Sequence, residues 1–172
     1  MQPGGVLFLD LARAATGWAY GHDLSAHPVA GAWELPGEST SMGRGMSFAS
    51  LGNELTRFIL NYRPARVGHE APLVASAQSH AMSARLQIGC AALVEEVCYR
   101  QEIEPEEYSV SHLRAEVIGR SRRTKLEIAA AIEVKDAIVA PWVRRMGWVI
   151  GDHNARDAAV GLAYMLGYRH QN

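Results

Sequence analysis

The chain has 172 residues, 48% of them hydrophobic and 20% charged, and its net charge is −1. This size and balance predict a single globular domain over residues 1–172. No apolar run approaches the length of about 20 residues that a membrane-spanning helix needs, and the amino-terminal residues do not resemble a signal peptide, so we expect a cytoplasmic protein. Cys90 and Cys98 have neither zinc-site nor redox-pair spacing and are expected to be buried free thiols.

Three short strands are predicted in the first third of the chain. Val6–Leu11, Thr16–Tyr20 and Val29–Leu35 are apolar segments joined by short, turn-rich connections. Short connections favour antiparallel neighbours, so these segments predict a three-stranded antiparallel unit. Asp10 stands near the end of the first strand.

A helix and a fourth strand follow. The helix is predicted from apolar residues at helical spacing, which are Leu51, Leu55, Phe58, Ile59 and Tyr62. Pro64 ends it, because the residue before a proline is disfavoured in helical conformation. The segment 66–72 then predicts a buried strand, with Glu70 near its carboxyl end.

The second half alternates helices and strands. A helix is expected over Ser79–Arg100 and a strand over Tyr108–Leu113. Thr124 and Glu127 form a capping-box pattern ahead of an alanine-rich helix, and a last helix begins near Asn154. The order β-β-β-α-β-α-β-α-α predicts a mixed sheet with helices on its faces, and sheets of this kind place their sites beyond the carboxyl ends of the strands.

Acidic side chains stand where those strands and the last helix would meet. Asp10 and Glu70 end apolar strands, and Asn154 and Asp157 are spaced to share one face of the last helix. Hard oxygen ligands of this kind suit Mg²⁺ or Mn²⁺, and two such ions can activate water and stabilise the leaving oxygen in phosphodiester hydrolysis. We expect Asp10 to bridge the ions, with Glu70 and Asp157 each holding one.

Each of these residues also has a purely structural interpretation. Asp10 could cap the turn after its strand, and Glu70 could pair with a surface arginine. Asn154 and Asp157 could be an N-cap and an acidic residue of the first helical turn. The joint occurrence of these acids in order favours the metal site.

A basic segment precedes the predicted alanine-rich helix. All but two of the 17 basic residues are arginine, which suits bidentate phosphate contacts. The segment could be a solvated loop, but its position before a helix N-terminus favours phosphate binding. The residues expected to neutralise phosphates are Arg114, Arg120, Arg122, Arg123 and Lys125.

Four motifs in order resemble the RuvC family of Holliday-junction resolvases, within the RNase H-like superfamily. The segment 9–19, with Asp10 before Thr16, Gly17 and Trp18, is similar to the family's opening. The segments 67–70, 113–125 and 154–163 are similar to its second acidic motif, its basic segment and its terminal motif. Asn154 stands where the family usually has Asp or His, and Leu11 and Ala12 replace its usual Pro and Gly.

The resemblance implies an RNase H-like mixed five-stranded sheet, three antiparallel strands followed by two parallel ones, flanked by helices. It implies a homodimeric endonuclease of a bacterial cell or phage-infected host that resolves four-way DNA junctions using two Mg²⁺ or Mn²⁺ ions. Asn154 or Asp152 would complete the metal site, and His153 could lie in its surroundings. The helix at 79–100 could make the dimer contact or be only a core helix.

Two other interpretations stay open, and a third is disfavoured. An RNase H-like nuclease could act on flaps, forks or RNA–DNA hybrids. A catalytically inactive DNA-binding relative would fit the uncharged Asn154. An actin-like kinase or ATPase shares the opening pattern. Such folds need two domains, for which this chain is too short, and glycine-rich phosphate turns, which the sequence lacks.

Overall fold

The computed structural model describes residues 4–12, 14–36, 40–72, 81–119 and 139–170. Five strands form one sheet in the order β3-β2-β1-β4-β5. The strands are β1 (Val6–Leu11), β2 (Ala15–Gly21), β3 (Val29–Glu34), β4 (Arg66–Glu70) and β5 (Pro105–Tyr108). β1, β2 and β3 pair antiparallel, whereas β4 runs parallel to β1 and β5 runs parallel to β4. The predicted mixed five-stranded sheet is therefore confirmed.

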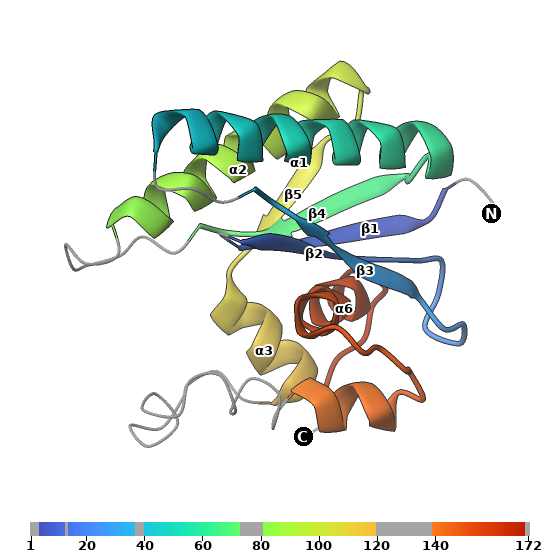
Figure 1. Cartoon of the computed structure of the whole chain (residues 1–172). Coiled ribbons are helices and arrows are strands. Elements are labelled where there is room, and N and C mark those ends of the chain that lie inside the picture. Colours follow the sequence, from blue (N-terminus) through green and yellow to red (C-terminus); the bar gives the residue numbers. More distant parts are fainter. Residues whose placement is uncertain (1–3, 13, 37–39, 73–80, 120–138, 171–172) are drawn as a thin grey trace.

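Helices cover both faces of this sheet. Figure 1 shows α1 (Ser41–Tyr62) and α2 (Ala81–Arg100) over one face, with α3 (Val110–Ile118) and α6 (His153–Met165) on the other. Residues 139–145 are also helical. No helix in the described ranges is long and apolar enough to cross a membrane.

β1 is buried on both faces, and its alternating side chains separate two cores. Leu7 and Leu9 belong to the core beneath α1 and α2, which also holds the buried thiols of Cys90 and Cys98. Phe8 belongs to the core beneath α6 and the 139–145 helix. This second core also contains Trp142. A strand that is buried on both faces has a continuous apolar sequence, as the segment from Val6 to Leu9 has.

The predicted strand over Tyr108–Leu113 is wrong beyond its first residue. β5 ends at Tyr108, and α3 begins at Val110 because Ser109 caps it: the Ser109 hydroxyl accepts a hydrogen bond from the His112 amide at 3.2 Å. A serine N-cap satisfies an amide that the first turn of a helix leaves unpaired. The capping box at Thr124 and the helix expected after it lie outside the described residues.

Candidate metal centre

The carboxyl ends of β1 and β4 lie side by side and carry two of the predicted acids. Leu9 is in register with His69, so Asp10 and Glu70 are the next residues on two neighbouring parallel strands. Side chains alternate along a strand, so Asp10 shares the face of Phe8, and Glu70 shares the face of Gly68. Phe8 and Gly68 both lie against α6: a Cβ on Gly68 would stand 2.4 Å from the Met165 sulfur. Asp10 and Glu70 therefore face α6.

Glycines let α6 approach the sheet closely at this end. Gly17 is the antiparallel partner of Asp10, and a Cβ on Gly17 would lie 2.1 Å from the Asn154 carbonyl oxygen and 3.0 Å from its Cβ. Further along α6, a Cβ on Gly161 would lie 2.2 Å from the Phe8 ring. The first turn of α6 is thus pressed onto β2 beside Asp10.

This packing sets Asp157 opposite the end of β1. Asp157 lies between Asn154, which contacts Gly17, and Gly161, which contacts Phe8, so it shares their helical face toward the sheet. Asp157 is 6% exposed and Asp10 is 4% exposed, whereas Glu70 is half-buried. Charged side chains are rarely buried in a protein, and these two aspartates lie on elements that face each other, which makes both candidates for ligands of one site.

The three carboxylates do not all lie in mutual contact in this structure. The oxygens of Asp10, Glu70 and Asp157 do not all lie within 4.8 Å of one another, and the described residues that do meet at this distance are His69, Glu95 and Glu107. Like charges repel at short range unless a cation or proton separates them. Closer convergence of the three around bound ions stays a prediction.

The other predicted ligands, Asp152 and Asn154, lie at the start of α6, where they have different surroundings. Asp152 is exposed and is the N-cap of α6, its Oδ1 accepting a hydrogen bond from the Ala155 amide at 2.9 Å. The alternative that Asn154 is the N-cap is therefore wrong. Asn154 is half-buried beside Gly17, and His153, the first residue of α6, is exposed. The donor set of Asp10, Glu70, Asp157 and Asn154 is all oxygen, which fits Mg²⁺ or Mn²⁺.

One member of the basic segment lies in the described structure. Arg114 is half-buried on α3, which begins just beyond the end of β5. Tyr108, the last residue of β5, is in register with Glu70, so α3 starts at the same edge of the sheet as the acidic residues. Arg120, Arg122, Arg123 and Lys125 lie outside the described residues.

Sequence reasoning missed the glycines that shape this centre. Gly17, Gly68 and Gly161 each face a residue that a Cβ would strike. The available signal was their position: Gly17 and Gly68 interrupt strands, where glycine often marks a close approach of another chain segment.

Comparisons with known proteins identify the fold. No family model and no curated protein sequence matches the chain. Among solved structures, Thermus thermophilus RuvC in complex with a Holliday-junction substrate matches with a TM-score of 0.65 at 13% identity, covering 95% of this chain and 93% of that one. A second structure of Thermus thermophilus RuvC matches with a TM-score of 0.57 at 13% identity, covering 96% and 98%.

A eukaryotic resolvase has the same architecture. The yeast mitochondrial Holliday-junction resolvase Ydc2 matches with a TM-score of 0.56 at 9% identity, covering 96% of this chain and 79% of that one. The predicted resemblance is therefore confirmed at the level of the fold, which is RNase H-like. The chain shares this fold with Thermus thermophilus RuvC over nearly its whole length.

Proposed function

We propose that this chain is a divalent-metal-dependent endonuclease that resolves four-way DNA junctions. The observation that carries the proposal is the buried Asp10 at the end of β1, with Asp157 of α6 opposite it and Glu70 on the neighbouring strand. The RuvC-type fold supports junction DNA as the substrate, because one similar structure is a complex with a Holliday junction.

The acidic residues account for the chemistry of phosphodiester hydrolysis. Two bound Mg²⁺ ions would supply a polarised water and stabilise the leaving oxygen. Asp10, which faces α6 from the end of β1, would bridge the two ions, while Glu70 and Asp157 would each hold one. The burial of Asp10 keeps its carboxylate in a poorly solvated position, where electrostatic interactions are stronger than in water.

Asn154, rather than Asp152, completes this ligand set. Asn154 lies over Gly17, the partner of Asp10, whereas Asp152 is exposed and uses one oxygen to cap the helix. Asn154 can offer its amide oxygen as a neutral ligand, a type that divalent hard cations accept. The expected cost of the missing charge is weaker metal binding, not a different reaction.

Positive charge for the DNA would come from α3 and the segment that follows it. Arg114 would contact a phosphate. Arg120, Arg122, Arg123 and Lys125, which lie outside the described residues, are proposed to contact the DNA as well. Each phosphate contact releases counterions, so binding should weaken steeply as salt rises.

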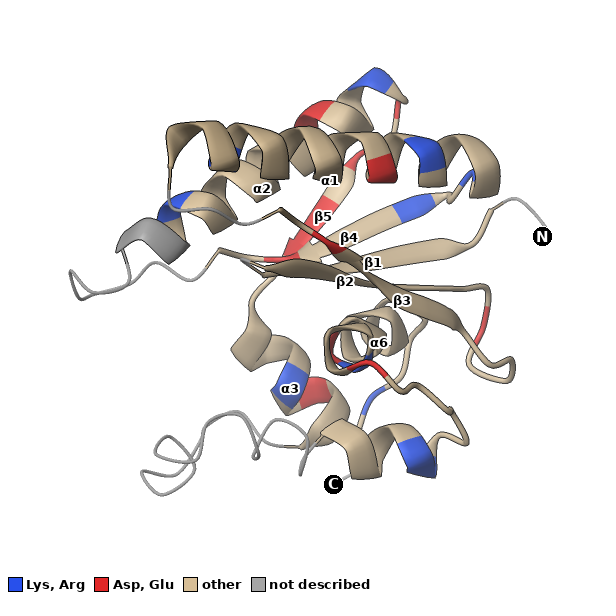
Figure 2. Cartoon of the chain, viewed as in Figure 1, with Lys and Arg blue, Asp and Glu red and all other residues tan. Residues whose placement is uncertain are grey.

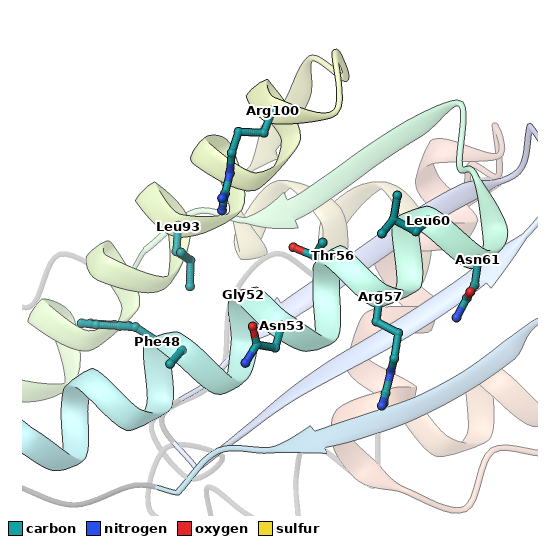
Figure 3. Close-up of a pocket in the computed structure, with 10 residues that line it drawn as sticks. Phe48, Gly52, Asn53, Thr56, Arg57, Leu60, Asn61, Leu93 and Arg100 are labelled. Atoms are coloured by element: carbon teal, nitrogen blue, oxygen red, sulfur yellow. The ribbon is translucent and has the colours of Figure 1, made fainter.

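We also propose that the chain acts as a homodimer through the α1–α2 side of the sheet. A surface groove of about 580 Å³ runs between these helices, and Figure 3 shows Phe48, Leu60 and Leu93 among its lining residues. Leu60 is 59% exposed, and Ile88 and Tyr99 of α2 are also exposed. Two copies that cover these apolar side chains would present two centres, as paired cleavage of a junction needs.

The dimer is tested by measuring mass in solution with light scattering. Leu60→Glu is expected to shift the protein from dimer to monomer. Val149→Glu is the matched control, because Val149 is 85% exposed but belongs to the loop before α6, on the other side of the sheet. A wild-type monomer at micromolar concentration would contradict the dimer.

The activity is tested on labelled four-way junctions, flaps, forks and RNA–DNA hybrids in Mg²⁺ or Mn²⁺. We expect symmetric paired nicks in the junction, and losses on the order of 10³-fold or more in Asp10→Asn, Glu70→Gln and Asp157→Asn. Asp23→Asn is the control, because Asp23 only holds a surface turn through Ser25 and Ala26. Cleavage confined to flaps or hybrids would reassign the substrate. Absent cleavage of every substrate would support the inactive relative.

A further inference from the structure

A second group of potential metal ligands lies on the opposite face of β4. His69 precedes Glu70 on the strand, so its side chain points toward α1 and α2, where it is 1% exposed. Glu107 is its register partner on the parallel strand β5, and Glu95 comes from α2. The ligand atoms of all three side chains lie within 4.8 Å of one another.

The hydrogen bonding of His69 leaves one ring nitrogen for a cation. Nδ1 lies 3.1 Å from the Glu70 carbonyl oxygen, and a carbonyl can only accept, so Nδ1 is the protonated nitrogen. In the neutral ring the lone pair is then on Nε2, which has no hydrogen-bond partner among the described residues. Metal-binding histidines typically donate their other ring nitrogen to a carbonyl or carboxylate in this way.

The two carboxylates of the group differ from their immediate neighbours. Glu106 pairs with Arg66, and Glu96 pairs with Arg100. Glu107 and Glu95, one residue away in each case, form no ion pair within the part of the chain that the structure describes. Figure 2 shows acidic residues gathered along β5. A cation between His69, Glu95 and Glu107 would offset this local excess of negative charge.

We propose that His69, Glu95 and Glu107 form a binding site for one divalent transition-metal ion of the Zn²⁺ type. A nitrogen and two carboxylate oxygens suit Zn²⁺, whereas Mg²⁺ prefers oxygen alone. Ligand atoms of a tetrahedral zinc site lie roughly 3.3–3.6 Å apart, so small side-chain movements would close this one. Glu95 and Glu107 are exposed, so an ion can reach the group from solvent.

Such an ion would tie α2 to the sheet. Its ligands come from β4, β5 and α2, so binding would hold this helix against two strands. The site does not depend on the nuclease proposal, because its side chains lie on the other face of the sheet from Asp10 and Asp157.

The test uses the metal-free full chain carrying Asp10→Asn and Asp157→Asn, which removes competing acids. We expect equilibrium dialysis to give one bound Zn²⁺ per chain, and Zn²⁺ to raise the melting temperature where millimolar Mg²⁺ does not. Glu95→Gln and Glu107→Gln should each weaken Zn²⁺ binding about tenfold or more. Glu104→Gln, an exposed acid one residue before β5, is the matched control and should bind as the parent does.

A spectroscopic readout separates this site from adventitious surface binding. Co²⁺ in place of Zn²⁺ should give visible absorption bands that weaken in Glu95→Gln and Glu107→Gln but not in Glu104→Gln. Equal Zn²⁺ affinity in all three variants, or no binding by the parent, would overturn the proposal. Either result leaves junction cleavage by the wild type in Mg²⁺ as a separate measurement.

Discussion

Gly17 of β2 lies directly against the backbone of Asn154, so close that any side chain on Gly17 would overlap the first turn of α6. A Cβ there would stand 2.4 Å from the Asn154 carbonyl carbon, and backbone cannot move aside as a side-chain tip can. Since Gly17 is the strand partner of Asp10, this contact determines how near α6 comes to the acidic residues.

Gly17→Ala should therefore disrupt the arrangement of the metal ligands in a chain that still folds. We expect a large loss of metal-dependent cleavage, because Asn154 and Asp157 move away from Asp10, together with destabilisation of about 1–3 kcal/mol from overpacking. Gly45→Ala is the control, because Gly45 is exposed within α1 and has free space around it, so it should gain up to about 1 kcal/mol. Urea unfolding and cleavage assays measure both effects. Full activity in Gly17→Ala would contradict this role.

The N-cap of α6 can be separated from its metal ligands. Asp152→Asn preserves a side-chain oxygen for the Ala155 amide, so both stability and cleavage should be retained. Asp152→Ala should lose about 1 kcal/mol, or roughly 2–4 °C in melting temperature. A strong loss of Mg²⁺ dependence in Asp152→Asn, with an unchanged melting temperature, would show instead that Asp152 is a ligand.

Arg66 links three elements, and its effect should depend on pH. Its guanidinium donates to both oxygens of Glu106, at 2.7 and 2.9 Å, and to the Met165 carbonyl at the end of α6. The bond from Arg66 holds the pKa of Glu106 below its ordinary value. A lowered folded-state pKa gives stability that is complete above the unfolded pKa and is lost as pH falls through the folded one.

Glu106→Gln should therefore be less stable than the wild type at pH 7, with the difference shrinking below about pH 4.5, the ordinary pKa of the group. The side chains of Arg66 and Glu106 are both more than a third exposed, so the ion pair should contribute less than about 1 kcal/mol to stability. Urea unfolding of both proteins at pH 7 and pH 3 measures the change. A stability difference of equal size at both pH values would show that packing, and not charge, is responsible.

Arg114 gives a test of the DNA-binding proposal within the described structure. Arg114→Gln should weaken junction binding and reduce the slope of log affinity against log salt by about 1, as expected for one lost phosphate contact. Fluorescence anisotropy across a salt series measures the slope. Arg145 is an exposed arginine at the last position of the 139–145 helix, and Arg145→Gln serves as the comparison. An unchanged slope in Arg114→Gln would remove Arg114 from the interface.

The first four strands and their acids could be predicted because local patterns determine them, whereas β5 was expected three residues too late. β1 and β4 are short apolar runs, and Asp10 and Glu70 stand out as charges at their ends. α3 could not be distinguished from a strand by periodicity, since the deciding feature was the cap at Ser109. The group on the opposite face of the sheet could not be predicted from the sequence. His69 meets Glu95 and Glu107 only through strand register and helix packing, which no local sequence pattern indicates.

The position of bound metal tests the central claim most directly. Crystals soaked in Mn²⁺ should show anomalous difference peaks within about 2–2.5 Å of carboxylate oxygens from Asp10, Glu70 and Asp157. The same soak of Asp10→Asn should lose those peaks. Manganese bound only at His69, Glu95 and Glu107, or nowhere at the ends of β1 and β4, would contradict the proposed catalytic centre.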